Sequence, residues 1–437
     1  MKYPNSEALF KRAQNVLPGG VSRNTLLRGA HPLYVLKGKG CRVTDVDGVE
    51  RIDFANNMAS HIHGHAFEPI VEAVSKQLQC GTAFTLATEA EVTFAEHLCS
   101  RNPAFDKVRF VNSGTEAVMA GMKAARAYTG RPKIAKVEGS YHGAYDYAEV
   151  SQAPTPENWG DSARPNAVPL AQGTPQSVSE DMVVLPFNEP EQSIAILDHY
   201  KDQIACILID PVPHRIGMSP AGSTFVAALR KWATDNGALL MFDEVITFRT
   251  EYGGAQALYD VRPDLTSMGK MIGGGFPVGA LAGRDDVMRV FTNGRLPHSG
   301  TFSANPVTMT AGRVAMAYFD RDAVAKLNRL GDYARASLAQ LFQTLGVPAC
   351  VTGAGSLLRM HMKPAIPANF REAHPTEVQK RALSTLINDL YDDGFMLIHT
   401  GAAALSTVMT EAEVDCLVES VASSMTRLKP LLLETVQ

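Results

Sequence analysis

From about residue 105 onward, short apolar runs typical of strands alternate with stretches typical of helices, and this alternation constrains the fold most. The predicted strands cover residues 107–111, 133–137, 204–209, 238–242, 265–268 and 279–282. The predicted helices between them cover residues 115–128, 191–200 and 223–235. A chain that alternates in this way is expected to form a mostly parallel sheet with helices on both faces.

The segments on either side of this alternation have a different pattern. The N-terminal part predicts a helix at 5–16, strands at 33–37, 42–46 and 50–54, and helices near 69–79 and 89–100. The C-terminal part predicts helices at 323–345, 375–393 and 410–427, with strands at 356–362 and 395–398. We therefore expect a large domain (56–320), a smaller α/β C-terminal domain (321–437) and an N-terminal helix and strand segment (1–55) that packs with the smaller domain.

One long segment, residues 151–185, is rich in Pro, Ser, Gly and Asn for most of its length and shows no periodicity. A loop of this length in a compact enzyme is usually a functional lid or is disordered. We favour the lid.

Composition excludes several classes of protein. With 437 residues, 45% of them hydrophobic and 20% charged, the chain matches an ordinary globular protein. The net charge of −4 gives no drive toward nucleic acid or an anionic membrane. Six scattered cysteines argue against a zinc cluster or a disulfide framework, so we expect no metal site and a cytoplasmic location. Neither a signal peptide nor a membrane span is expected, because no apolar run approaches ~18 residues.

A single lysine, Lys270, stands out between Met268-Gly269 and a triple glycine. No acid lies close to it in sequence. Upstream, an apolar run ends in Asp243-Glu244-Val245, which places carboxylates at the carboxyl end of a strand, where open α/β sheets hold ligands. A surface lysine and a helix N-cap are the ordinary alternatives. Together, however, these residues suit pyridoxal phosphate, whose aldehyde forms a Schiff base with lysine and whose pyridine nitrogen is kept protonated by an aspartate.

A second motif, Asn112-Ser-Gly-Thr-Glu-Ala117, follows a predicted strand and opens a predicted helix. Ser113 and Glu116 have the spacing of a capping box, so the motif could be only a helix start. Gly114 adds close backbone approach, and Ser113 and Thr115 add hydroxyls beside unpaired N–H groups, which together make an anion site. In the presence of Lys270 we favour a phosphate site.

Three further segments carry polar or aromatic residues with two interpretations each. Tyr141 or His142 either stacks on a planar cofactor or packs in the core. Arg215 either binds a substrate carboxylate or forms a surface salt bridge. Gly300 and Thr301 either add donors for the phosphate or belong to an ordinary loop before a helix at 307–318.

These segments resemble, in order and over nearly the whole chain, the class III aminotransferases of PLP fold type I. The resemblance is greatest to the branch that contains glutamate-1-semialdehyde 2,1-aminomutase. The matching stretches are Pro18-Gly-Gly-Val21, Asp47-Gly48, Gly64-His65, Asn112-Ser-Gly-Thr-Glu-Ala117, Gly139-Ser-Tyr-His-Gly143, Phe242-Asp-Glu-Val245, Gly269-Lys-Met-Ile-Gly-Gly-Gly275 and Gly300-Thr301.

The resemblance implies a large domain with a mostly parallel, seven-stranded type of sheet, a smaller α/β C-terminal domain, and pyridoxal 5'-phosphate as the cofactor. Lys270 is then the Schiff-base lysine and proton shuttle, and Asp243 is the partner of the pyridine nitrogen. The other implied cofactor-binding residues are Tyr141 and Val245 on the two ring faces, His142 beside them, Ser113, Gly114 and Thr115 at the phosphate, and Gly300 and Thr301. The last two reach the phosphate of a neighbouring subunit in this family, which implies a homodimer with shared active sites, and 151–185 resembles the gating loop.

Two departures from the aminomutase pattern bear on the reaction. Asp210-Pro-Val-Pro-His-Arg215 lacks the aminomutase asparagine, and Gly401-Ala-Ala-Ala-Leu405 stands where the aminomutase has a Phe-Glu-Ala-Gly-Phe segment with its glutamate. We therefore expect a two-substrate, ping-pong transamination between a small amino acid or amine and an oxo acid. Isomerisation, by an aminomutase or by another PLP isomerase or racemase, is the alternative.

Other classes of protein are disfavoured by what the sequence lacks or would leave unused. A dinucleotide oxidoreductase is disfavoured because no Gly-x-Gly-x-x-Gly follows the first strand. A non-catalytic binding protein is disfavoured because it would have no use for the lysine, the aspartate and the phosphate motif together. Arg23, Arg28 and Arg215 are candidate carboxylate clamps, with Arg359 a weaker one, and the sequence does not indicate the donor, the acceptor or the stereochemistry.

Overall fold

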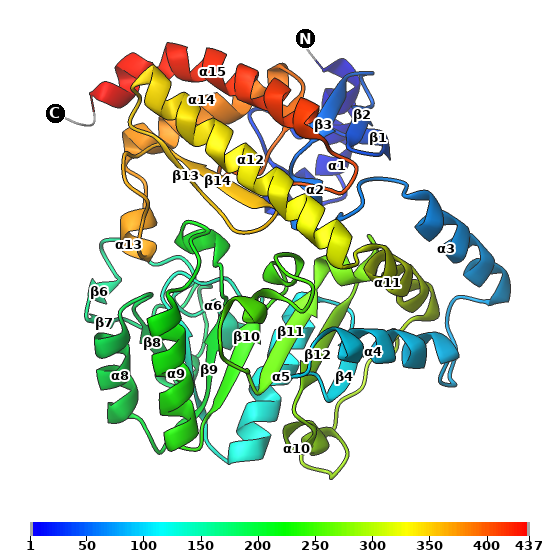
Figure 1. Ribbon diagram of the computed structural model, residues 1–437, viewed down its shortest axis with the longest axis vertical. Helices are drawn as coiled ribbons and strands as arrows, with labels where there is room; N and C mark the ends of the chain where they lie inside the picture. Colours follow the sequence, from blue (N-terminus) through cyan, green and yellow to red (C-terminus); the bar gives the residue numbers. More distant parts are fainter. Residues whose placement is uncertain (1–2, 435–437) are drawn as a thin grey trace.

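The computed structural model describes residues 3–434 and contains a seven-stranded sheet at its centre (Figure 1). Its strands, in spatial order, are β4 (Lys107–Val111), β12 (Gly279–Gly283), β11 (Leu265–Gly269), β10 (Leu239–Asp243), β9 (Ile204–Ile209), β5 (Lys133–Val137) and β8 (Met182–Leu185). Only β12 runs antiparallel to its neighbours. The predicted α/β fold with a mostly parallel sheet is confirmed.

Helices cover both faces of this sheet, because successive side chains of its buried strands point to opposite sides. Met241 packs in the core layer beneath α5 (Gly114–Thr129), and its neighbour Leu240 packs in the opposite layer beneath α9 (Ser223–Asp235). α8 (Pro190–His199) lies beside α9 on that face (Figure 1). This arrangement leaves the carboxyl edge of the parallel strands free to hold the polar residues that follow them.

The N-terminal strands and the C-terminal elements lie together above the large sheet (Figure 1). β1 (Val35–Lys39), β2 (Arg42–Asp45) and β3 (Glu50–Asp53) share a sheet with β15 (Phe395–Met396), in which β15 pairs with β3. A second small sheet contains β13 (Cys350–Thr352), β14 (Leu357–His361) and β16 (Ala402–Ala404). The division into domains stays a prediction, and residues 1–2 and 435–437, at the ends of the predicted N-terminal segment and C-terminal domain, lie outside the described residues.

The remaining helices include those that were predicted, together with four of four residues each, at 56–59, 146–149, 285–288 and 370–373, that were not. They are α1 (Pro4–Gln14), α2 (Asn56–Ala59), α3 (Glu68–Cys80), α4 (Glu89–Arg101), α6 (Asp146–Glu149), α10 (Asp285–Met288), α11 (Pro306–Tyr318), α12 (Arg321–Leu345), α13 (Phe370–Ala373), α14 (Glu377–Asp392) and α15 (Glu411–Leu433). The predicted end of the last helix near residue 427 is wrong, because α15 continues through Pro430 to Leu433.

The interpretation of 151–185 as a segment without regular structure is also wrong in part. It contains β6 (Gly160–Asp161), β7 (Arg164–Pro165), α7 (Gln176–Glu180) and the edge strand β8. The four apolar residues of β8 stand between Asp181 and Pro186, and the polar composition before them hid the short strand. β13 and β16 were not predicted either, because each has only three residues.

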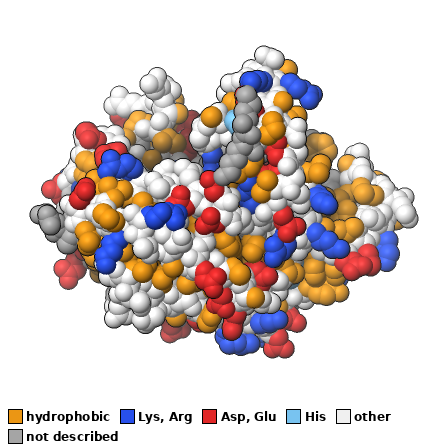
Figure 2. Space-filling view, turned by 90° about the horizontal axis from the view of Figure 1, so that it is seen from above, with side chains coloured by type: hydrophobic (Ala, Val, Ile, Leu, Met, Phe, Trp, Pro, Cys, Tyr) orange, Lys and Arg blue, Asp and Glu red, His pale blue; other side chains and the backbone are white. Residues whose placement is uncertain are grey.

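The surface carries both signs of charge. Figure 2 shows basic and acidic side chains interspersed with apolar ones on the face above the C-terminal elements, in keeping with the small net charge of −4. Within residues 3–434, no helix combines the length and the apolar character needed to cross a membrane.

Candidate active site

A cavity of about 180 Å³ lies at the carboxyl edge of the large sheet. It is lined by residues that follow five different strands and begin α5: Gly114, Thr115, Val118, Tyr141, His142, Gly143, Asp210, Asp243, Val245, Ile246 and Lys270. Most of the residues proposed from the sequence for the ring and the phosphate thus share one cavity. Ligands bind at this edge in open α/β sheets.

Lys270 directly follows β11 and begins the short helix η6 (Lys270–Gly273). Its backbone has a φ of +49°, which is uncommon for a residue with a side chain and is a form of strain that clusters at functional sites. Burial lowers the pKa of the Lys270 amine, and the carboxyl groups of Asp243 and Asp210 oppose this by raising it. The result is an amine held closer to its neutral, nucleophilic form than a surface lysine.

Asp243 ends β10 and accepts three hydrogen bonds. His142 Nδ1 donates to Oδ2 over 2.7 Å, and Ser267 Oγ and the Val245 N–H each donate to Oδ1 over 3.1 Å. Hydrogen bonds to a carboxylate favour its charged form. Burial lowers the pKa of His142 and Asp243 raises it, so a neutral ring with its proton on Nδ1 suits this contact.

Glu244, the second acid of the motif, does not line the cavity. Its carboxylate accepts from the backbone N–H groups of Ala255 and Gln256 and from the Gln256 side chain, which holds the turn η5 (Ala255–Leu258) in place. Burial raises the pKa of Glu244 to about 7. The two adjacent acids therefore have separate positions, and only Asp243 faces the cavity.

Asp210 is a cavity residue to which the sequence analysis gave no role. It follows β9, is buried, and accepts a hydrogen bond from the Val212 N–H at 2.9 Å. Burial, with repulsion from Asp243, raises the pKa of Asp210 well above its ordinary value. The signal that could have found it is the one that marked Asp243, an acid directly after a buried strand.

The start of α5 combines both interpretations of its motif. Ser113 Oγ accepts from the Glu116 N–H at 3.1 Å as a helix cap, while the Glu116 carboxylate accepts from the Asn112 N–H at 2.7 Å. Gly114 and Thr115 line the cavity and Ser113 does not. A Cβ at residue 114 would lie 2.8 Å from a methyl group of Val245, so glycine is required for this close packing. An anion at this edge would meet the helix N-terminus.

Gly300 and Thr301 are not brought to the Lys270 cavity within one chain. Both are exposed, and Thr301 lines a separate cavity of about 50 Å³ with Phe84, Leu86 and neighbouring residues. A Cβ built on Gly300 would lie 3.7 Å from Asn112 Nδ2, so Gly300 is close to the start of the predicted phosphate motif, but neither residue lines the cavity.

The candidate arginines differ in their surroundings. Arg215 lies over the Tyr141 ring, 5.7 Å from its centroid, and the described residues place no carboxylate within ion-pair distance of it. Arg23 is exposed and donates to Asn57, while Arg28 stacks on Tyr391. Arg359 donates to the backbone carbonyls of Thr400 and His214, and burial with repulsion from Arg215 lowers its pKa to about 10.

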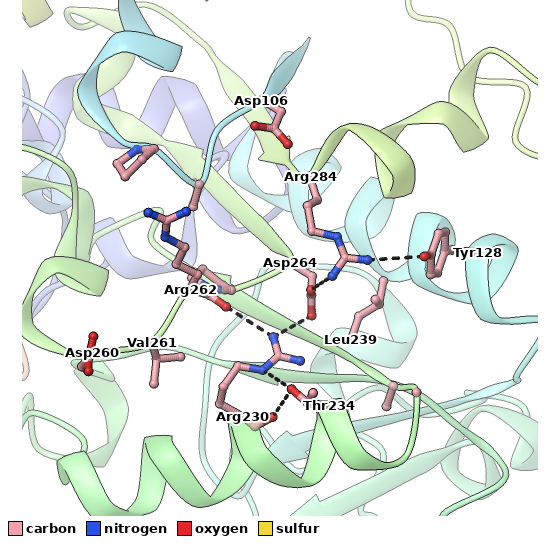
Figure 3. Close-up of a pocket in the computed structure, with 15 residues that line it drawn as sticks. Asp106, Tyr128, Arg230, Thr234, Leu239, Asp260, Val261, Arg262, Asp264 and Arg284 are labelled. Atoms are coloured by element: carbon pink, nitrogen blue, oxygen red, sulfur yellow. Dashed lines mark hydrogen bonds and ion pairs between the residues drawn. The ribbon is translucent and has the colours of Figure 1, made fainter.

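A larger cavity, of about 570 Å³, lies at the opposite, amino edge of the sheet. Figure 3 shows Asp264 between Arg230 and Arg284 there. The distances from its carboxylate to the two guanidinium groups are 2.8 and 2.5 Å. Asp264 is thus already paired with both arginines, and Arg284 also pairs with Asp286. No lysine or strand-end acid of the sequence motifs lines this space among the described residues. We therefore place the candidate site at the carboxyl edge.

Residues 26–423 match the aminotransferase class-III family. The chain belongs to the class III aminotransferases. It is 40% identical, over 85% of its length and 87% of the relative's, to glutamate-1-semialdehyde 2,1-aminomutase of Methanothermobacter thermautotrophicus. The structure of an omega-transaminase from Sphaerobacter thermophilus superposes with a TM-score of 0.94 at 44% identity, covering 96% of this chain and 97% of that one. A transaminase with PLP bound gives a TM-score of 0.90 at 41% identity, with complete coverage of both chains.

The cofactor is pyridoxal 5'-phosphate, as in other members of the class III family, and the residues of the cavity fit it. The N-terminus of α5 with Gly114 suits the phosphate, and a buried carboxylate faces the same space as a lysine of lowered pKa. The fit rests on the chemistry of these residues, the N–H groups that begin α5, the carboxylate and the lysine, and on the space beside Gly114, which has no side chain.

The loop that carries Tyr141 and His142 is held by a buried lysine of the aminotransferase, Lys136 in β5. Its Nζ donates to the carbonyls of Ser140, Ala148 and Val150 at 3.0, 2.8 and 2.7 Å, which ties both ends of the loop to the sheet. Burial lowers the pKa of Lys136 to about 7.

Replacing Lys136 by methionine should destabilise the aminotransferase by about 2–5 kcal/mol, because three buried carbonyls lose their donor. Urea unfolding followed by circular dichroism measures this. Lys133→Met, in the same strand but with its amine near the surface, is the control and should cost less than ~1 kcal/mol. Equal stability of the two variants would show that the three contacts do not hold the loop.

Proposed function

We propose that this protein is an aminotransferase that moves an amino group from a small amino acid or amine to an oxo acid by a ping-pong mechanism. The observation that carries the proposal is the placement of Lys270 and Asp243 in one cavity with the start of α5. Similarity to two solved transaminases supports it. We also propose a cytoplasmic location, which six unpaired cysteines support.

Each residue has a proposed role. Bound pyridoxal phosphate supplies an aldehyde that exchanges amines and a ring that withdraws electrons. Lys270 carries the cofactor between turnovers and, when displaced by the donor amine, takes the proton from the substrate carbon at Nζ. Asp243 holds the pyridine N–H, and His142 orients Asp243. Tyr141 and Val245 would cover the two ring faces, and Gly114 and Thr115 would bind the phosphate, with Ser113 capping the helix that presents them.

Transamination rather than isomerisation is supported by the C-terminal segment. Residues 401–405 carry no acid, and the strand β16 within them is buried. An aminomutase such as the one from Methanothermobacter thermautotrophicus is the second candidate, favoured by 40% identity. The test is incubation with one amino substrate and no oxo acid. A transaminase stops after one equivalent per site, and repeated turnover of a single compound would establish an isomerase.

We propose that Arg215 binds the substrate carboxylate, since its guanidinium lies beside Tyr141 at the cavity and lacks an acidic partner among the described residues. Arg215→Gln should raise KM for a carboxylate-bearing amine about 10- to 100-fold, as expected for the loss of a charge-assisted hydrogen bond. The KM for an amine of similar size without a carboxylate should not change. Arg262→Gln, at the amino edge, is the control. If Arg215→Gln raised KM equally for both amines, Arg215 would not be the residue that binds the carboxylate.

We also propose a homodimer in which Gly300 and Thr301 complete the partner's phosphate site. Exposed apolar side chains beside this segment support it: Leu86 is 82%, Phe302 61% and Phe84 52% exposed. The test mixes two inactive variants, Lys270→Ala and Thr301→Glu. If sites are shared, the hybrid dimer contains one site with both residues intact, and activity returns. Failure of the mixture to regain activity, with hybrids shown by native mass spectrometry, would refute shared sites.

A further inference from the structure

Asp210 and Asp243 end neighbouring parallel strands in the Lys270 cavity. The register of β9 and β10 pairs Ile209 with Phe242, so the residues that follow, Asp210 and Asp243, lie side by side. Both line the cavity that contains Lys270, and Asp210 is only 7% exposed. The amine of Lys270 thus shares one cavity with two buried carboxyl groups.

The two carboxyl groups have unequal surroundings. Asp243 accepts from His142, Ser267 and the Val245 N–H, whereas the described contacts of Asp210 give it one donor, the Val212 N–H. Two adjacent buried carboxyl groups do not both ionise readily, and the one with more donors keeps the charge. Asp243 is therefore the carboxylate, and Asp210 is the group on which a proton can rest.

We propose that Asp210 is a further acid–base residue of the site, which shares one proton with the Lys270 nitrogen. In one state the proton is on a carboxyl oxygen of Asp210 and Nζ is unprotonated and neutral. In the other state the O–H bond has broken, an N–H bond has formed, and a carboxylate faces a protonated, cationic nitrogen. No electrons are gained or lost. The inference rests on the proposed function, because it concerns the amine that the aminotransferase uses as a base.

The directions of the pKa shifts agree with a shared proton. Burial and Asp243 raise the pKa of Asp210, burial lowers that of Lys270, and Asp210 raises the pKa of Lys270. Such pairs titrate together rather than singly. Other titratable or charged groups surround the pair on the elements that pack against the cavity. They are Asp243 and Glu244 after β10, Tyr141 and His142 after β5, His214 and Arg215 after β9, and Tyr259.

The test is a pH titration of the visible cofactor absorbance of the holoenzyme, which reports protonation at the Lys270 nitrogen without turnover. Asp210→Asn keeps the shape and removes the proton-sharing oxygen. Its midpoint should fall by about one pH unit, a tenfold weaker hold on the proton. The acid limb of kcat/KM should move the same way. Asp210→Glu should keep the wild-type midpoint more closely than the Asn variant.

The control is Asp260→Asn, which removes an exposed acid at the amino edge and should leave the midpoint unchanged. If the Asn variant does not fold, Asp210→Ser gives the same reading. An unchanged or raised midpoint in a folded, cofactor-containing Asp210 variant would overturn the inference and leave the proposed function standing. A wild-type protein that shows no visible cofactor band would instead refute the proposed function.

Discussion

Under the proposed function, replacing Lys270 by alanine is expected to abolish transamination, with a loss of at least ~10⁴-fold in kcat, because we propose that its nitrogen both carries the cofactor and moves the substrate proton. Among residues 3–434, no other lysine lines the cavity that could take its place. The visible absorbance of the bound cofactor should change to that of the non-covalently held form. Both quantities are measured on purified protein with a keto-acid acceptor in excess.

The control for this variant is Lys107→Ala, which removes an exposed lysine from the start of β4 and should leave turnover and absorbance unchanged. The unfolding temperature of the Lys270 variant is expected to stay the same or to rise, because an amine with a pKa lowered by burial is costly to keep in the folded protein. Turnover within tenfold of the wild type would remove Lys270 from the mechanism.

The second large effect is expected for Asp243→Asn. The neutral amide of the Asn variant cannot form an ion pair with the pyridine N–H. It would also present either its C=O or its N–H group to the His142 N–H, and the N–H group cannot accept that hydrogen bond. We expect kcat to fall roughly 10³-fold, the scale seen when one electrostatic contact to developing charge is removed. Steady-state kinetics and cofactor content are measured together, so that weak cofactor binding is separated from slow chemistry.

Ser267→Ala is the matched comparison for Asp243. It removes one of three donors to the same carboxylate, at 3.1 Å, and leaves the acid in place. We expect a loss below about tenfold, since a single neutral hydrogen bond contributes roughly 1 kcal/mol. Equal losses in the two variants would mean that the charge of Asp243 is not what the reaction requires.

The helices and strands that could be predicted from the sequence are those whose pattern of apolar residues lies within the element itself. The parallel strands are nearly continuous apolar runs, and each is followed by a polar or glycine-rich turn. Because the carboxyl ends of parallel strands meet at one edge, Gly114, Tyr141, Asp243 and Lys270 could be expected near one another although they lie far apart in the chain.

The features that were missed depend on contacts that no local pattern contains. Lys136 looks like a solvent-facing lysine within a strand, and only the return of the loop at Ala148 and Val150 buries it. Asp210 has the same position in β9 as Asp243 in β10, but its role appears only when the register places them together. The proposed places of Gly300 and Thr301 at a cofactor require a second chain, which no pattern within one chain contains.

The pairing of β3 with β15 has a consequence for biosynthesis. Residues 50–53 find their partner strand only when residues 395–396 have left the ribosome, long after residues 50–53 themselves. Until then β1, β2 and β3 form a small meander with an unpaired edge, which is a site for wrong association. The large sheet, whose strands lie between residues 107 and 283, contains all of its own strands much earlier. We expect newly made chains to complete the large sheet first and to protect the N-terminal strands last, an order that hydrogen exchange on ribosome-bound chains stalled before and after residue 396 has emerged would reveal.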